Sequence, residues 1–156
     1  MDKSLIRHLD ISYNPQLTKR FYRELMEVLA EPGNVIERLE IEGNGIGDRQ
    51  LHELVEAMVE SKTIVYLNVN RNKIGDAGAR DLAILIEACP KLRLLFMHYN
   101  RILGFGGTEL AQAIGQSKSL QVLDISWNAI CSTGLKKKKE EMTEEEKKKS
   151  EEEKAA

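Results

Sequence analysis

The sequence predicts an α/β solenoid shaped like a horseshoe, with parallel strands on its concave face and helices on its convex face. Two observations lead to this prediction. A nine-residue phrase recurs five times and ends in asparagine each time, at intervals of 30 residues and then 28. Between the copies, the apolar spacing changes from about two residues to about 3.6, so each unit is a short strand followed by a helix. Because one such unit cannot bury its own apolar side, the five units are expected to stack around a shared core.

The strands come from the pattern L/I-x-x-L-x-L/I/V/M-x-x-N, whose fourth and sixth letters are expected to point into the core. In the first copy, Ile6, Leu9 and Ile11 are assigned to the core. The five strands are predicted near residues 6–12, 36–42, 64–70, 92–98 and 120–126.

The helices follow from the residues after each asparagine. The first helix follows Pro15 and ends at the turn of residues 31–34. Its predicted apolar face comprises Leu17, Phe21, Leu25, Val28 and Leu29. In the next two units the phrase continues Asn-x-Ile-Gly-Asp, so Asp48 and Asp76 are predicted to cap the helices that follow. The fourth unit has a glycine-rich turn instead, and its helix is expected to carry Leu110, Ala111 and Ile114.

The whole phrase resembles the leucine-rich repeats of the ribonuclease-inhibitor-like class, over residues 4–135. The pattern breaks at Leu135, because Lys138 and Lys139 stand where earlier units carry core residues. We therefore predict one leucine-rich repeat domain, residues 1–135, with five repeats. Residues 136–156 hold eight lysines and eight glutamates and form a charged tail, predicted to be disordered or partly helical.

Composition narrows the choice of partners and compartment. A net charge of -2 and a pI near 6.0 predict no nucleic-acid partner, because binding a phosphate backbone needs a basic face. No apolar run has the length of a signal peptide or a membrane span, so no membrane partner is expected. Cys89 and Cys131 occupy different phases of the repeat, and a disulfide between them is not expected. The predicted location is cytoplasmic, including the cytoskeleton or a cilium or flagellum.

Residues for catalysis do not converge in this pattern. His8, His52 and His98 lie in three separate repeats, and the glycine clusters lack the Gly-Lys-Ser/Thr ending of a phosphate loop. We predict no enzyme activity, no catalytic or metal-binding residue and no cofactor. The recurring asparagines are instead predicted to bond buried backbone groups, as a structural ladder. They are Asn14, Asn44, Asn72, Asn100 and Asn128.

The concave face carries the predicted binding site. Alternation turns the third, fifth and seventh letters outward and leaves the eighth at the rim. The N-terminal end of this face is acidic, through Asp10, Glu40 and Glu42, whereas aromatic residues gather toward the other end. Exposed aromatic clusters anchor protein interfaces, although Tyr99 and Trp127 could instead protect the turns by local packing. The predicted contact residues are Tyr66, Arg71, Leu94, Phe96, His98, Tyr99 and Trp127.

These features predict a non-catalytic protein–protein interaction module that acts as a subunit or adaptor of a larger intracellular complex. Neither end of the array has an evident polar cap, so we expect either that other chains cover the ends or that the sequence is part of a longer repeat array; a multi-subunit assembly fits both. The resemblance implies a cytoskeletal or ciliary and axonemal setting. One alternative is a GTPase activator like that of Ran, which is built of similar repeats but has about twice as many and an acidic tail. Others are an inhibitor-type binding protein and a designed or truncated scaffold.

Overall fold

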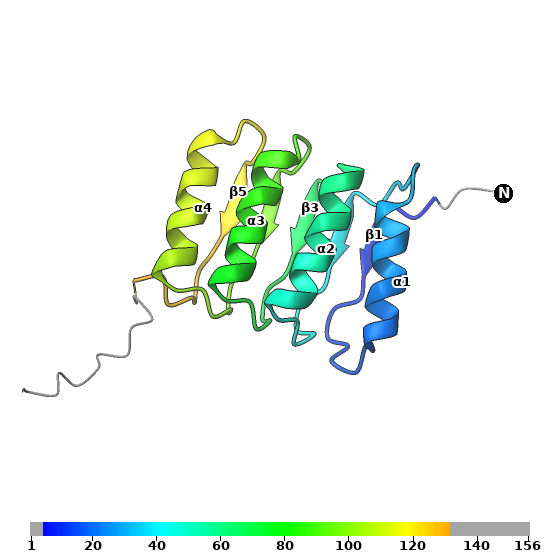
Figure 1. The fold of residues 1–156 in the computed structure, drawn as a ribbon, viewed down its shortest axis with the longest axis horizontal. Coiled ribbons are helices and arrows are strands. Elements are labelled where there is room, and N and C mark those ends of the chain that lie inside the picture. The colour runs from blue at the N-terminus through cyan, green and yellow to red at the C-terminus, as the bar shows by residue number, and fades with distance from the viewer. Residues whose placement is uncertain (1–4, 132–156) are drawn as a thin grey trace, which may run out of the picture.

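The computed structural model describes residues 5–131, which form one parallel sheet covered by a single layer of helices (Figure 1). The strands are β1 (His8–Asp10), β2 (Arg38–Glu40), β3 (Tyr66–Asn68), β4 (Leu94–Phe96) and β5 (Val122–Asp124). The helices are α1 (Lys19–Ala30), α2 (Asp48–Ser61), α3 (Asp76–Ala88) and α4 (Gly104–Gln116). The sheet order is β1-β2-β3-β4-β5, which confirms the predicted solenoid. Residues 132–135 and the predicted charged tail lie outside the described residues.

The strand register places equal letters of the phrase side by side. Leu39 pairs with Leu67, which pairs in turn with Leu95, and all three are fully buried. The sixth-letter residues Ile41 and Val69 are buried as well. Each layer of the core is therefore contributed by one unit and covered by the next, as expected for a repeat solenoid.

Several residues that the pattern assigns to the core are exposed. Ile6 is 55% exposed, Val28 is 45% exposed and Ile114 is 42% exposed, and Ala111 is exposed too. These core assignments were wrong because each residue belongs to the first or the last unit with a described helix, where one side of the unit has no described helix beyond it. Tyr22, which the pattern did not select, is buried in α1 instead.

A hydrogen bond links the start of α2 to the start of α3, and another links the start of α3 to the start of α4. The prediction that Asp48 and Asp76 cap their own helices was wrong. Gly47 and Gly75 are the N-cap residues of α2 and α3, and each aspartate is the first helical residue. The Asp48 Oδ1 atom accepts a hydrogen bond of 2.6 Å from the backbone N–H of Gly75, the N-cap residue of α3. Asp76 does the same for the N–H of Leu103, the N-cap residue of α4, at 2.7 Å. Each carboxylate therefore satisfies an N–H at the start of the following helix.

Glycine at the third position of a helix makes this approach possible. A Cβ atom at Gly78 would lie 2.7 Å from Asp48 Oδ1, and one at Gly106 would lie 2.7 Å from Asp76 Oδ1. The third residue of α2 is Gln50, which has a long side chain. The α1–α2 pair therefore lacks the small residue that the next two helix pairs share.

The two cysteines have different environments, and neither forms a disulfide. Cys89 is buried with its thiol 3.5 Å from the Met58 carbonyl oxygen, and burial raises the pKa of the Cys89 thiol to about 11. Cys131 is exposed. Since the thiolate is the reactive form, a thiol reagent at pH 8 is expected to modify one cysteine per folded chain. Mass spectrometry should assign the label to Cys131, and Cys131→Ser should abolish it until denaturant is added. Rapid labelling of both cysteines in the folded chain would contradict the burial of Cys89.

Candidate protein-binding surface

The asparagine at the end of each phrase holds the turn that follows each strand. The Asn72 side chain donates to three backbone carbonyls, among them those of Ile41 and Val69, at 2.9 and 3.0 Å. Its Oδ1 atom accepts from the backbone N–H groups of Asn44 and Ile46, at 3.1 and 3.0 Å. Asn72 thus bonds backbone groups of two units. Similar bonds to backbone recur at Asn14, Asn44, Asn100 and Asn128.

The rim residue before each asparagine has a left-handed backbone. The angle φ is +57° at Tyr13, +53° at Arg71, +51° at Tyr99 and +54° at Trp127, and Gly43 has +68°. Large side chains seldom adopt this conformation, so the surrounding bonds must hold it. The N–H of Arg71 donates to the His98 carbonyl of the following unit at 2.9 Å, and the N–H of Tyr99 donates to the Ser126 carbonyl at 3.1 Å.

Three of these rim side chains form a stack across neighbouring units. The Arg71 guanidinium lies 4.6 Å from the centre of the Tyr99 ring. Tyr99 in turn stacks on Trp127, with ring centres 5.0 Å apart and ring planes 4° apart. Glu42 Oε1 lies 3.2 Å from Arg71 Nε at the N-terminal end of the row. We call Arg71, Tyr99 and Trp127 the rim stack.

A second row, with the same order of an arginine, a tyrosine and another aromatic residue, lies on the strands themselves. The Arg38 guanidinium is 3.8 Å from the centre of the Tyr66 ring, and the ring centres of Tyr66 and Phe96 are 5.3 Å apart. Glu40 Oε1 lies 2.9 Å from Arg38 Nε. We call Arg38, Tyr66 and Phe96 the inner stack. Both stacks therefore run arginine, tyrosine, aromatic from the N-terminal side, and in both a glutamate orients the arginine.

His98 lies between the two stacks and is itself fixed. Its Nδ1 atom is 3.2 Å from Asp124 Oδ2, and its ring meets the Tyr99 ring edge-on with centres 5.5 Å apart. Hydrogen bonds from Ser126, together with His98, hold the pKa of Asp124 below its ordinary value. Leu94 pairs with Tyr66 on one side and has the same letter of the phrase. The face is thus a set of side chains held by one another.

At the acidic end of the face, the Glu42 carboxylate is bonded to side chains of the same face. Glu42 accepts hydrogen bonds from the Tyr13 hydroxyl and from the Asn68 amide, and pairs with Arg71. Burial raises the pKa of Glu42, but the bonds from Tyr13 and Asn68 and the charges of His98 and Arg71 outweigh it and lower the pKa. At neutral pH the carboxylate is therefore charged and matched by its neighbours.

The structure brings the seven predicted contact residues onto one face, five of them within the two stacks. The prediction missed Arg38, although that residue has the same letter as Tyr66 one unit earlier. Alternation also turned Asn68 and Asn70 outward, yet both are only 6% exposed. Both amides are held by hydrogen bonds: Asn68 donates to Glu42 at 3.1 Å, and the Asn70 Oδ1 atom accepts from the N–H of His98 at 2.8 Å.

Two other kinds of feature, a metal site and a membrane-spanning helix, are absent from residues 5–131. On the convex side, His52 lies 3.1 Å from Asp81 and 3.4 Å from Glu56. No group of three or more histidine, cysteine, aspartate or glutamate residues within this part of the chain could hold a metal ion. No helix in the same range has both the length and the apolar character needed to cross a membrane.

Comparison with known proteins agrees with this architecture. A family model described as Leucine Rich repeat matches residues 60–83 and 116–137. No curated protein matches the sequence. Among solved structures, the tropomodulin C-terminal domain of Caenorhabditis elegans is similar, with a TM-score of 0.71 and 20% sequence identity over 80% of this chain and 76% of that one. Leiomodin-1 Actin-Binding Site 2 has a TM-score of 0.66 and 18% identity over 76% of this chain and 69% of its own.

The repeated phrase, the parallel register and these matches show that the chain has a leucine-rich repeat fold. At this level of identity, the likeness to solved structures concerns the fold.

Proposed function

We propose that this protein is a non-catalytic interaction module, and that it holds a protein partner on the face formed by the two stacks. This two-stack surface comprises Arg38, Tyr66, Arg71, Leu94, Phe96, His98, Tyr99 and Trp127. The observation that carries the proposal is the presence of aromatic rings in ordered rows on a solvent-facing sheet. Trp127 is 71% exposed and Tyr99 is 41% exposed.

Residue type and order both favour binding. Tryptophan, tyrosine and arginine are enriched among the residues that dominate the binding energy of protein interfaces. Here each arginine is already stacked and paired with a glutamate, at 3.2 Å for Arg71 and 2.9 Å for Arg38. A partner would therefore meet side chains that lose little conformational entropy on binding.

A cytoskeletal role is the finer part of the proposal. Its support is the structural similarity to a tropomodulin domain and to a leiomodin-1 domain named as an actin-binding site. We propose actin, or a protein bound to actin filaments, as the first partner to test, with this chain as a subunit or adaptor of the assembly. A cytoplasmic location belongs to the same proposal, and a ciliary or axonemal setting stays a prediction.

The test compares two double variants, each of which replaces two large apolar side chains by alanine. Phe96→Ala with Trp127→Ala removes one ring from each stack, whereas Phe105→Ala with Ile114→Ala removes two exposed apolar side chains from α4. Purified actin, as monomer and as filament, and a native extract are the binding materials. The stack variant is expected to lose capture by about thirtyfold, because removing a central interface aromatic costs about 2 kcal/mol or more. The α4 variant should bind like the original chain, and circular dichroism should be equal for all three.

Two outcomes would count against the proposal. Equal capture by the stack variant and the original chain would remove the two-stack surface as the binding site. Capture of extract proteins with no binding of actin in either form would reject the actin part alone.

A further inference from the structure

A cleft of about 310 Å³ lies between α1 and α2 on the convex side of the solenoid. The helices, and not the concave strands, supply its walls, so the cleft is separate from the two-stack surface. Its basic side chains are Lys19 and Arg23 from α1 and Arg49 from α2.

One side chain of the cleft differs from the residues at the same helical position in the next two units. In the next two helix pairs, a glycine at the third helical position lets a carboxylate and the neighbouring helix come close, at Gly78 and Gly106. The third residue of α2 is Gln50, and its side chain lines the cleft. At this helical position the α1–α2 boundary therefore has a long side chain, whereas the next two boundaries have glycine.

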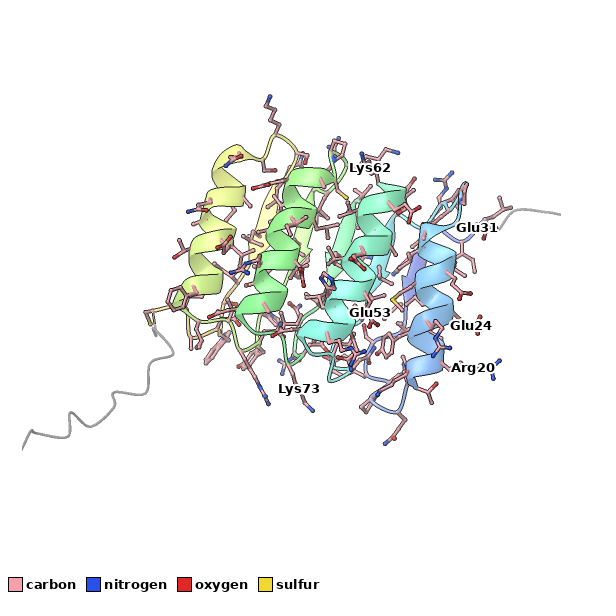
Figure 2. All side chains as sticks on the ribbon, viewed as in Figure 1. Arg20, Glu24, Glu31, Glu53, Lys62 and Lys73 are labelled. Atoms are coloured by element: carbon pink, nitrogen blue, oxygen red, sulfur yellow. The ribbon has the colours of Figure 1, made fainter. Side chains whose placement is uncertain are left out.

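The cleft carries an excess of positive charge. Within residues 5–131, neither Lys19 nor Arg23 forms an ion pair. Glu53 is the acidic residue that lines the cleft, and it lies 3.6 Å from Arg49. Figure 2 shows Glu53 on α2, while Arg20 and Glu24, which pair with each other at 3.7 Å, extend from the side of α1 turned away from α2. Two cations of the cleft thus have no carboxylate of their own.

Apolar surface lies beside these charges. Tyr22 is 8% exposed and belongs to the core, and Met26 is packed partly against it; both line the cleft. A bound segment could therefore bury an apolar side chain against Met26 and place acidic groups near Lys19 and Arg23. This combination fits a peptide better than a polynucleotide, since phosphate-backbone binding needs an extended basic face and the whole chain has a net charge of -2.

We propose that the α1–α2 cleft binds an acidic peptide segment of a partner protein. Carboxylates of the segment pair with Lys19, Arg23 and Arg49, and an apolar side chain lies against Tyr22 and Met26. The protein would then hold partners on two faces, one through aromatic stacks and one through charge. Because exposed ion pairs are individually weak and are screened by salt, this second contact is expected to be weak and strongly salt-dependent.

The experiment is fluorescence anisotropy with the full chain and a short labelled peptide in which aspartates and glutamates flank leucines. The comparison peptide has asparagine and glutamine in place of the acids. The cleft variant Lys19→Ala, Arg23→Ala, Arg49→Ala is matched by Arg20→Ala, Arg80→Ala, Lys91→Ala, which removes the same charge from exposed positions outside the cleft. Urea denaturation shows that each variant is folded.

The acidic peptide is expected to bind the original chain and the matched control alike, and to bind the cleft variant at least about tenfold more weakly, as loss of three exposed charge pairs predicts. The neutral peptide should bind poorly, and added salt should weaken the acidic one. Three results would overturn the proposal: no binding of the acidic peptide at low salt, equal loss in the cleft variant and the matched control, or displacement of the peptide by a lower concentration of duplex DNA than of unlabelled peptide.

Discussion

Replacement of Asn72 by alanine is expected to lower the free energy of unfolding by about 3–5 kcal/mol. Asn72 is 7% exposed and takes part in five hydrogen bonds to backbone groups. The methyl group of alanine replaces none of them, and a buried group left unpaired costs about 1–3 kcal/mol. Since the bonds involve two units, the loss should weaken the joint between them.

Urea denaturation followed by circular dichroism measures the effect. Asn14→Ala is the matched control, because Asn14 occupies the same letter of the phrase at the exposed end of the array. Its side chain donates to the carbonyls of Ile11 and Ser12, and water can replace those bonds. We expect a loss of about 1 kcal/mol there. Equal losses in the free energy of unfolding at Asn14 and Asn72 would show that the central asparagine stabilises the fold no more than the terminal one.

Two glycines of α4 are expected to respond in opposite directions to alanine. A Cβ atom at Gly106 would lie 2.8 Å from the Cβ of Ala79 in α3 and 2.9 Å from Ile102, whereas at Gly115 it would meet nothing within 4 Å. Alanine at either site gains up to about 1 kcal/mol in helix propensity. At Gly106 this gain is outweighed by overpacking, which costs about 1–3 kcal/mol, and by strain on the bond from Leu103 to Asp76.

Gly106→Ala is therefore expected to destabilise the protein by about 2 kcal/mol, and Gly115→Ala to stabilise it by about 0.5 kcal/mol. Thermal unfolding of both variants beside the original chain provides the comparison. A gain in stability at Gly106 would mean that α3 and α4 can separate without cost, which the close Cβ of Ala79 argues against.

The strand register follows from the repeat phrase, because both the period of the phrase and the register arise from the stacking of equal units. Equal letters must pair when equal units stack, so Leu39, Leu67 and Leu95 could be aligned from spacing alone. The same logic overestimates burial at the ends. Ile6 and Ile114 fit the pattern, but a pattern cannot show which units have a neighbour.

Interactions between units were harder to predict than those within one. Asp48 has the position of a helix cap, and local reasoning assigned it to its own helix, yet its partner is 27 residues away at Gly75. The left-handed backbone of Tyr99 and Trp127 gives no sequence signal either, since glycine is the residue that marks such positions and here only Gly43 does so.

At the candidate surface, too, features of a single unit could be predicted, whereas contacts between units could not. Alternation selected Tyr66 and Phe96, because outward direction follows from the phrase. It did not indicate that Arg38 covers Tyr66 or that Arg71 covers Tyr99, since stacking depends on side-chain conformation across units. Arg38 has the same letter as Tyr66 in the neighbouring repeat, and the register pairs the two residues. Residues with equal letters in neighbouring repeats are therefore candidates for such stacking.

The left-handed backbone of the rim residues affects how the surface can change in evolution. Tyrosine, glycine, arginine, tyrosine and tryptophan occupy the same letter with φ between +51° and +68°, so the scaffold sets the path of the chain whatever side chain is present. If the two-stack surface binds a partner as proposed, mutation at this letter is expected to change specificity while leaving the architecture intact. Homologous proteins could therefore come to bind different partners by substitution of one rim residue per repeat, without a change in the fold.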